Sequence, residues 1–218
     1  NEFFRTSQLS TILDQTNPLS EVDNLRKLSV MGTGGISRER ASFSIRDINA
    51  SQYSRICPVK SPEGPNIGLV TFLSLYARID EYGFLQAPYR NVKTGNVSYF
   101  SADDERNHKI THATANLKGV RVPVRYKGEF IEVPPEDVEY VDVNPQQVVG
   151  AAAALIPFLA HDDGIRALMA ANMQAQAVPL VAPQAPVVGT GMEVAVSGAM
   201  GWTIKSNSNG TVEFSDAN

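Results

Sequence analysis

One predicted helix carries polar side chains that could bind a ligand on an otherwise apolar face. Residues from Asp162 or Asp163, either of which could cap its start, to about Gln176 have the periodicity of a helix. At about 100° per residue, Asn172 and Gln176 each lie about 20° from Ile165, on the arc that also holds Leu168, Met169 and Met173. Arg166 lies in the first turn of the same helix. Either the amides satisfy buried backbone groups, or this helix faces a ligand.

Two loops near the N-terminus could also contact a ligand. Arg38 and Arg40 follow a glycine-rich segment at residues 32–35, and guanidinium groups on such a loop suit phosphates. The alternative is that both arginines are simply solvated. Residues 61–66 (SPEGPN) form a second predicted turn, because proline and glycine alternate with polar residues there.

Several well-defined catalytic motifs are absent. No glycine-rich segment ends in Gly-Lys-Ser/Thr or continues as a dinucleotide-binding fingerprint, and no Gly-x-Ser-x-Gly or His-Glu-x-x-His occurs. The acidic clusters at residues 103–105 and 162–163 are more typical of a solvated loop and a helix cap. Cys57 is the single cysteine, and the three histidines are scattered, so the sequence predicts no zinc site and no internal disulfide.

Composition indicates a globular chain with a real core. The 218 residues are 43% hydrophobic and 19% charged, with a formal net charge of -4, which argues against a chain that is basic over its whole surface. The lone cysteine favours a reducing compartment. The first residue is Asn and no signal peptide follows, so we expect a fragment of a longer protein. The uncharged run at residues 167–192 contains several prolines and amides, which argues against a membrane helix.

The local patterns predict an α+β fold in three parts. The first part, residues 1–70, has a predicted helical turn at residues 9–13 and a short helix at residues 21–30 capped by Ser20. In the second part, residues 71–155, alternating segments at 120–126, 130–133 and 138–143 predict half-buried antiparallel strands. Asn144-Pro145 then opens an alanine-rich helix to about Leu155. The third part, residues 156–218, contains the amide-bearing helix, after which strands and turns are expected.

Many short segments closely resemble the β subunit of bacterial multisubunit RNA polymerase. They occur in the order of that family and extend from about Phe3 to Glu193. The segments are residues 7–10 (SQLS), 14–21, 34–41, 55–58 (RICP), 61–69 (SPEGPNIGL), 81–85 (EYGFL), 154–159 (ALIPFL), 161–163 (HDD), 166–169 (RALM), 171–174 (ANMQ) and 188–193 (VGTGME).

The resemblance implies a fragment of the catalytic β subunit of DNA-directed RNA polymerase. Residues 1–70 would be the fork region, residues 71–155 the β-rich external domain, and residues 156–218 the beginning of the hybrid-binding domain. The family transfers nucleotidyl groups from ribonucleoside triphosphates to an RNA 3′ end, with Mg²⁺ ions held by the β′ subunit rather than by this chain. The implied partners are β′, α, ω and sigma subunits, template DNA and nascent RNA, in the cytoplasm at the nucleoid. Alone, the fragment would be inactive.

The resemblance also assigns roles to individual residues. Arg166 matches an arginine that approaches the incoming triphosphate, Asn172 and Gln176 match residues near the nascent RNA, and the turn with Glu63 and Asn66 would border the RNA 3′ end. Arg40 matches a fork-loop arginine near downstream DNA. These roles favour the ligand-facing interpretation of the amide-bearing helix. The chain departs from the usual family residues at three places nearby, which are Ala175, Ile165 and the pair Lys60-Ser61.

A further implied site is the pocket that binds rifamycin antibiotics in this family. Its equivalents here are Thr11, Ile12, Asp14, Asn24, Lys27, Ser29, Met31, Arg38, Pro62 and Asn66. Four of them differ from the usual family residues, because Thr11 replaces Gln, Ile12 replaces Phe, Asn24 replaces His and Lys27 replaces Arg. The resemblance therefore predicts a polymerase with poor intrinsic sensitivity to rifamycins.

Two other classes of function compete with this interpretation. One is a stand-alone nucleic-acid-binding or scaffold module derived from the same fold. The other is an unrelated, self-contained hydrolase or transferase, against which the missing nucleophile and metal motifs argue.

Overall fold

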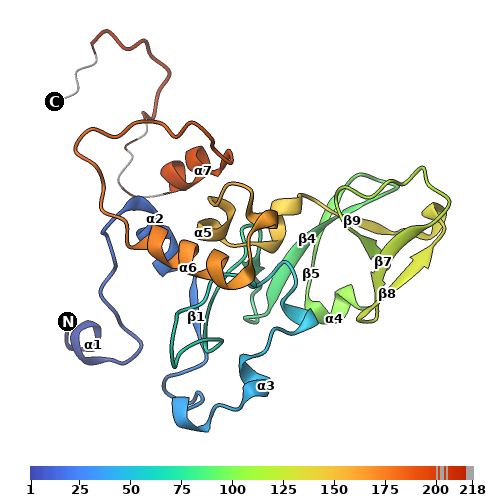
Figure 1. The fold of residues 1–218 in the computed structure, drawn as a ribbon, viewed down its shortest axis with the longest axis horizontal. Coiled ribbons are helices and arrows are strands. Elements are labelled where there is room, and N and C mark those ends of the chain that lie inside the picture. Colours follow the sequence, from blue (N-terminus) through green and yellow to red (C-terminus); the bar gives the residue numbers. More distant parts are fainter. Residues whose placement is uncertain (200, 202–203, 205, 215–218) are drawn as a thin grey trace.

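The computed structural model describes residues 1–199, 201, 204 and 206–214 of the chain. It has an α+β fold, as the sequence predicts, with a sheet toward one end of the molecule and the helices α2, α5, α6 and α7 grouped beside it (Figure 1). No helix in the described part of the chain is both long enough and apolar enough to cross a bilayer.

The N-terminal part consists of short elements joined by long loops. They are α1 (Glu2–Thr6), α2 (Pro18–Leu25), β1 (Lys27–Ser29), η1 (Arg38–Arg40), α3 (Phe43–Arg46), η2 (Ala50–Gln52) and β2 (Val70–Phe72), and β1 pairs with β2 in antiparallel register. The predicted helical turn at residues 9–13 is wrong, because Leu9 and Ile12 are exposed and have no surface to pack against among the described residues.

The helix predicted at residues 21–30 is displaced. Asn17 rather than Ser20 is the N-cap of α2, and its side chain accepts a hydrogen bond from the Ser20 backbone N–H. Pro18 occupies the first helical turn, where its fixed φ and missing N–H are tolerated. The helix ends at Leu25 because the following residues enter β1, whose backbone pairs with a strand some 40 residues later.

The middle part forms a seven-stranded sheet. Its main order is β3-β4-β9-β6-β7-β8, and β5 pairs with β4. The strands are β3 (Arg78–Ile79), β4 (Leu85–Asn91), β5 (Val97–Phe100), β6 (Ile110–Thr111), β7 (Val122–Tyr126), β8 (Glu129–Val133) and β9 (Tyr140–Asp142), with α4 (Ala102–Glu105) and η3 (Pro135–Asp137) between them.

The predicted antiparallel strands at residues 120–126 and 130–133 are confirmed as β7 and β8. They form a hairpin whose two turn residues, Lys127 and Gly128, both have positive φ angles as a tight hairpin requires. The expectation of purely antiparallel strands is wrong in one place. The strand β9 is antiparallel to β4 but parallel to β6, so the sheet is mixed. Local alternation could not reveal this, because it reports burial and not the direction of the neighbouring strand.

The C-terminal part is helical. It comprises η4 (Pro145–Val148), α5 (Ala151–Ala154), η5 (Leu159–His161), α6 (Gly164–Ala175) and α7 (Met192–Ala199). Asn144 caps η4 as predicted, but the single alanine-rich helix is interrupted before α5. A Cβ atom at Gly150 would lie 3.2 Å from Cys57 Cβ, and the Val149 carbonyl accepts a hydrogen bond from Leu75 N–H. This close contact with β2 and the loop after it favours an extended backbone at the break.

The expectation of strands after Gln176 is wrong for the described residues, which contain α7 and no strand there. Thr190 and Glu193 begin this helix as a capping pair, because the Glu193 carboxylate accepts a hydrogen bond from Thr190 N–H at 2.8 Å. That bond lowers the pKa of Glu193. Residues 200, 202, 203, 205 and 215–218, which the predicted third part includes, lie outside the described residues.

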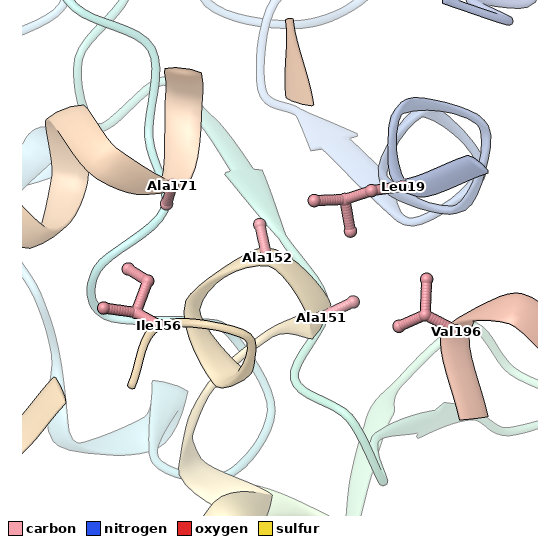
Figure 2. Packing of buried hydrophobic residues seen from close by; sticks show 6 residues of the cluster. All are labelled: Leu19, Ala151, Ala152, Ile156, Ala171 and Val196. Atoms are coloured by element: carbon pink, nitrogen blue, oxygen red, sulfur yellow. The ribbon is translucent and has the colours of Figure 1, made fainter. Parts of the chain in front are cut away.

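One apolar core joins the helices. Figure 2 shows side chains from α2, α5, α6, α7 and the segment after α5 pointing toward one another. They are Leu19, Ala151, Ala152, Ile156, Ala171 and Val196. Four small helices from distant parts of the sequence therefore share a core in which half of the buried side chains are alanine.

Arg55 connects the N-terminal part to the sheet, and we expect its replacement to destabilise the chain. The side chain is 2% exposed, and its guanidinium donates to Glu105 at 2.6 Å and to carbonyl groups at Leu85 and Phe100. Arg55→Met should lower the free energy of unfolding by about 3–5 kcal/mol, because it breaks a buried ion pair and leaves Glu105 with only its longer contact to Arg125, at 3.7 Å, among the described residues. Urea denaturation of the purified chain, followed by circular dichroism, measures this loss.

Arg78→Met is the matched control, since Arg78 is exposed and its side-chain hydrogen bond is to Gln86. A loss for Arg55→Met no larger than that of the control would contradict the prediction.

Candidate functional site

The helix α6 begins as the sequence predicts. Asp163 is its N-cap and accepts a hydrogen bond from Ile165 N–H at 3.3 Å. Arg166 is exposed in the first turn, and its side chain contacts Met169 Sδ at 3.8 Å. Within the described ranges no carboxylate forms an ion pair with Arg166. Its positive charge is therefore available to an anionic ligand.

The buried face of α6 is not the arc of large apolar side chains. Ala167 and Ala171 are its buried residues, whereas Ile165 is 66% exposed and Met173 is 63% exposed. The small alanine side chains let α6 pack closely against α5, which is also made of alanines. Ile165 and Met173 consequently lie toward the outside of this chain, whereas Leu168 and Met169 are half-buried.

The two amides of α6 have different surroundings. Asn172 is half-buried, and its side-chain amide donates to the Ser61 carbonyl at 2.8 Å. It thus satisfies a backbone group, as one of the two interpretations predicts. Gln176 is exposed at the C-cap position, and no side-chain hydrogen bond is recorded for it among the described residues. The two amides can therefore be distinguished by experiment.

The Asn172 hydrogen bond attaches α6 to the predicted turn at residues 61–66. The Ser61 hydroxyl accepts a hydrogen bond from Gly68 N–H at 3.0 Å, which closes the turn. Glu63 is exposed at its tip, beside Gly64, which has a φ of 86°. Asn66 is half-buried, and its side-chain oxygen has no hydrogen-bond partner among the described residues. Glu63, Asn66 and Asn172 thus belong to one connected unit.

Arg46, which the sequence did not indicate, holds the loop that bears Arg38 and Arg40 (the basic loop) against the turn at residues 61–66. Its guanidinium donates to the carbonyls of Pro65 at 2.7 Å and Ile67 at 2.9 Å, and more weakly to that of Arg38. Gly68 permits this approach, because a Cβ atom there would lie 2.5 Å from the Arg46 carbonyl oxygen. No sequence pattern marked Arg46, because its partners are backbone carbonyl groups about 20 residues later in the chain.

The basic loop itself presents two free cations. Arg38 and Arg40 lie in η1 and are exposed. No carboxylate forms an ion pair with either of them in the described part of the chain. Both are consequently accessible to phosphate groups, and this exposure is compatible with either alternative from the sequence, phosphate contact or simple solvation.

Lys60 and Asp23 form a buried ion pair that joins this turn to α2. The Nζ atom of Lys60 lies 3.3 Å from Asp23 Oδ2, and the two side chains are 5% and 8% exposed. Burial raises the pKa of Asp23, against the opposing attraction of Lys60. Lys60 departs from the usual residue of the family that the sequence resembles, but nothing in the sequence indicated its partner.

The residues matched to the rifamycin pocket lie along the surface of the N-terminal part and on the turn at residues 61–66. Thr11, Ile12 and Asp14 are exposed in an irregular segment, where Asp14 accepts hydrogen bonds from Thr16 that lower its pKa. The others lie on α2, β1, the loops that follow and that turn, and are half-buried or exposed. They are Asn24, Lys27, Ser29, Met31, Arg38, Pro62 and Asn66.

A cavity of about 730 Å³ lies elsewhere, between residues 48–53, α4 and the β7–β8 hairpin, and none of the predicted site residues lines it. Nor does any cluster of three or more His, Cys, Asp or Glu side chains suited to a metal ion occur among the described residues.

Two family comparisons cover more than half of the chain. Residues 11–79 match the family described as RNA polymerase Rpb2, domain 3, and residues 89–144 match the RNA polymerase beta subunit external 1 domain.

Individual relatives match nearly the whole chain. A DNA-directed RNA polymerase subunit beta of Methylacidiphilum infernorum (isolate V4) is 51% identical over an alignment of 221 positions, which covers 97% of this chain and 17% of the relative. That of Sorangium cellulosum (strain So ce56) is 52% identical over 99% of this chain and 16% of the relative. That of Thermosynechococcus vestitus (strain NIES-2133 / IAM M-273 / BP-1) is 48% identical over 100% of this chain and 21% of the relative. The chain spans about a fifth or less of the length of these relatives.

The two amides of α6 give a paired test of the site geometry. Asn172→Ala should lower the free energy of unfolding by about 1 kcal/mol, because it leaves the Ser61 carbonyl without its donor. Gln176→Ala should change it by less than about 0.5 kcal/mol, as expected for an exposed side chain. Urea denaturation of both variants checks this difference, and equal effects would show that the hydrogen bond does not contribute.

Proposed function

The chain belongs to the family of bacterial RNA polymerase β subunits, and we propose that it helps to position the substrates of RNA synthesis. In this proposal Arg166 contacts the incoming ribonucleoside triphosphate, and Glu63, Asn66, Asn172 and Gln176 lie near the 3′ end of the nascent RNA. Arg40 lies near downstream DNA.

The observation that supports the proposal most is the hydrogen bond from Asn172 to Ser61. It joins the helix that bears Arg166 to the turn that bears Glu63 and Asn66, although 111 residues separate its two ends. A triphosphate held at one end of α6 and an RNA end held at the turn would therefore have a fixed mutual orientation. Nucleotidyl transfer depends strongly on such positioning.

The chemistry assigned to this chain is electrostatic. In the reaction the RNA 3′ oxygen forms a bond to the α-phosphorus of the triphosphate, and the bond to the pyrophosphate leaving group breaks. Arg166 would stabilise negative charge on the triphosphate, since a guanidinium group forms strong charge-assisted hydrogen bonds with phosphate oxygens. Mg²⁺, held by the partner β′ subunit, would supply the Lewis-acid chemistry.

The proposal places the chain within a larger assembly. The partners would be the β′, α and ω subunits and a sigma factor, together with template DNA, and the site of action would be the nucleoid in the cytoplasm. Exposed apolar side chains such as Phe4, Ile12 and Phe43 support the presence of neighbouring protein, because large apolar groups are rarely left in water in such number.

Arg166→Ala tests the proposed contact with the triphosphate. In a polymerase assembled with the full-length β subunit, the substitution should lower kcat/KM for nucleotide addition about tenfold or more. Loss of a charge-assisted contact costs about 1.5–3 kcal/mol, and each 1.4 kcal/mol is tenfold. Single-nucleotide addition measured over a range of triphosphate concentrations gives this value.

Arg121→Ala is the matched control, because Arg121 is exposed just before β7. Unchanged kinetics with all four triphosphates in the Arg166 variant would refute the assignment. Template-directed RNA synthesis by the isolated chain would also refute it, since the chain is proposed to lack the metal-binding carboxylates.

The rifamycin-pocket residues give an independent prediction. Thr11 and Asn24 are shorter than the usual family residues and would leave drug polar groups unpaired, while Ile12 and Lys27 remove an aromatic wall and a planar guanidinium. Two unpaired groups at about 1–3 kcal/mol each would reduce affinity roughly a hundredfold. The polymerase should therefore be poorly sensitive to rifampicin in a titration of RNA synthesis.

The double substitution Thr11→Gln and Asn24→His should restore part of that sensitivity. Ordinary sensitivity of the unmodified enzyme, or no gain in the double variant, would show that these positions do not control drug binding.

A further inference from the structure

The C-terminal end of α6 is held by the side chain of Asn17. The last carbonyl groups of a helix have no partner within the helix. Asn17 Nδ2 donates to the carbonyls of Gln174 at 3.1 Å, Ala175 at 3.1 Å and Ala177 at 2.8 Å. Its side-chain oxygen accepts from Ser20 N–H at 2.8 Å. One side chain, 7% exposed, therefore caps the start of α2 and the end of α6 at once.

Lys60 holds the same helix one turn earlier. Its ammonium group donates to the Ala171 carbonyl at 2.9 Å, directly before Asn172, and is paired with Asp23. An ammonium group in such a buried position is costly unless it is paired and hydrogen-bonded. Both conditions are met here, and the two partners lie on different helices. Lys60 therefore fixes α6 against α2 and against the turn that begins at Ser61.

We propose that Asn17 and Lys60 are positioning residues that clamp the C-terminal half of α6. The clamp sets where Asn172 and Gln176 lie relative to Glu63 and Asn66. The inference rests on the proposed function, in which Asn172, Gln176, Glu63 and Asn66 lie near the RNA 3′ end. Neither clamp residue is on α6, and both act through its backbone carbonyls.

Loss of the clamp should lower the maximal rate of nucleotide addition more than it weakens binding of the triphosphate. Arg166 lies at the other end of α6, about 7 Å along the helix axis from Ala171 at 1.5 Å per residue. A loosened C-terminal half would therefore displace the groups near the RNA end while leaving the triphosphate contact in place. Small misplacement of reacting groups can lower the rate by up to about a hundredfold.

Two substitutions remove the clamp, and only the first leaves the surrounding charges unchanged, because Lys60→Met also deprives the buried Asp23 carboxylate of its ion-pair partner. Asn17→Ser keeps an N-cap acceptor for α2 but removes the donor to α6. Lys60→Met keeps a long apolar side chain but removes the ammonium group. Asn144→Ser is the control for the first, since Asn144 also caps a helix. Lys109→Met is the control for the second, since it removes the partly exposed ion pair with Asp137 in the sheet region.

The four variants should be compared in the assembled polymerase. Single-nucleotide addition from stalled complexes, normalised to the fraction of active complexes, gives the maximal rate and KM for the triphosphate. We expect Asn17→Ser and Lys60→Met each to lower the maximal rate roughly tenfold, with KM within about twofold of the unmodified enzyme. The double variant should lose less than the product of the two effects, because both residues hold the same helix. The controls should match the unmodified enzyme.

Unchanged maximal rates in both clamp variants would overturn the inference, even if their melting temperatures fall. A rise in KM without a fall in the maximal rate would also overturn it. If Lys60→Met fails to assemble, the conservative Asn17→Ser variant decides the question. An effect of Arg166→Ala without any effect of the clamp variants refutes the clamp alone, whereas the reverse pattern refutes the proposed triphosphate contact alone.

Discussion

The guanidinium of Arg55 is the contact on which the arrangement of the N-terminal part and the sheet depends. It donates to Ser51 and Tyr53 in its own segment and to Leu85, Phe100 and Glu105 in the sheet region. A planar group with five N–H donors can bond to several segments at fixed angles, which an ammonium group cannot. Beside it Arg125 stacks on Tyr53 and pairs with Asp142, extending the buried network.

The helical core relies on polar contacts for a different reason. Its alanine side chains allow close approach of α5 and α6, but small, similar surfaces define relative position poorly. The hydrogen bonds from Asn17, Lys60 and Asn172 are directional and supply that definition. Close packing and buried donors are thus complementary, because the first brings the helices together and the second selects one arrangement.

Local sequence signals predicted local structure well and long-range structure poorly. The strands β7 and β8 and the Asp163 cap of α6 depend on adjacent residues, and these predictions are confirmed. The parallel pairing of β6 with β9 and the break at Gly150 depend on segments far away in the chain. For the same reason the sequence indicated Arg166 and Asn172 as candidates but not Arg46, Asn17 or Lys60, whose roles arise from carbonyl groups that no sequence pattern marks.

The distribution of charge explains how an acidic chain can present a basic surface. Its net charge is -4, yet several carboxylates are paired inside the fold, where Asp23, Glu105 and Asp142 bind Lys60, Arg55 and Arg125. Each pair is neutral overall and contributes little to the potential outside, so the surplus of negative charge lies on other residues of the chain. By contrast, Arg38, Arg40 and Arg166 have no ion-pair partner among the described residues. Phosphates approaching any of these three side chains would therefore meet local positive charge that the net charge conceals.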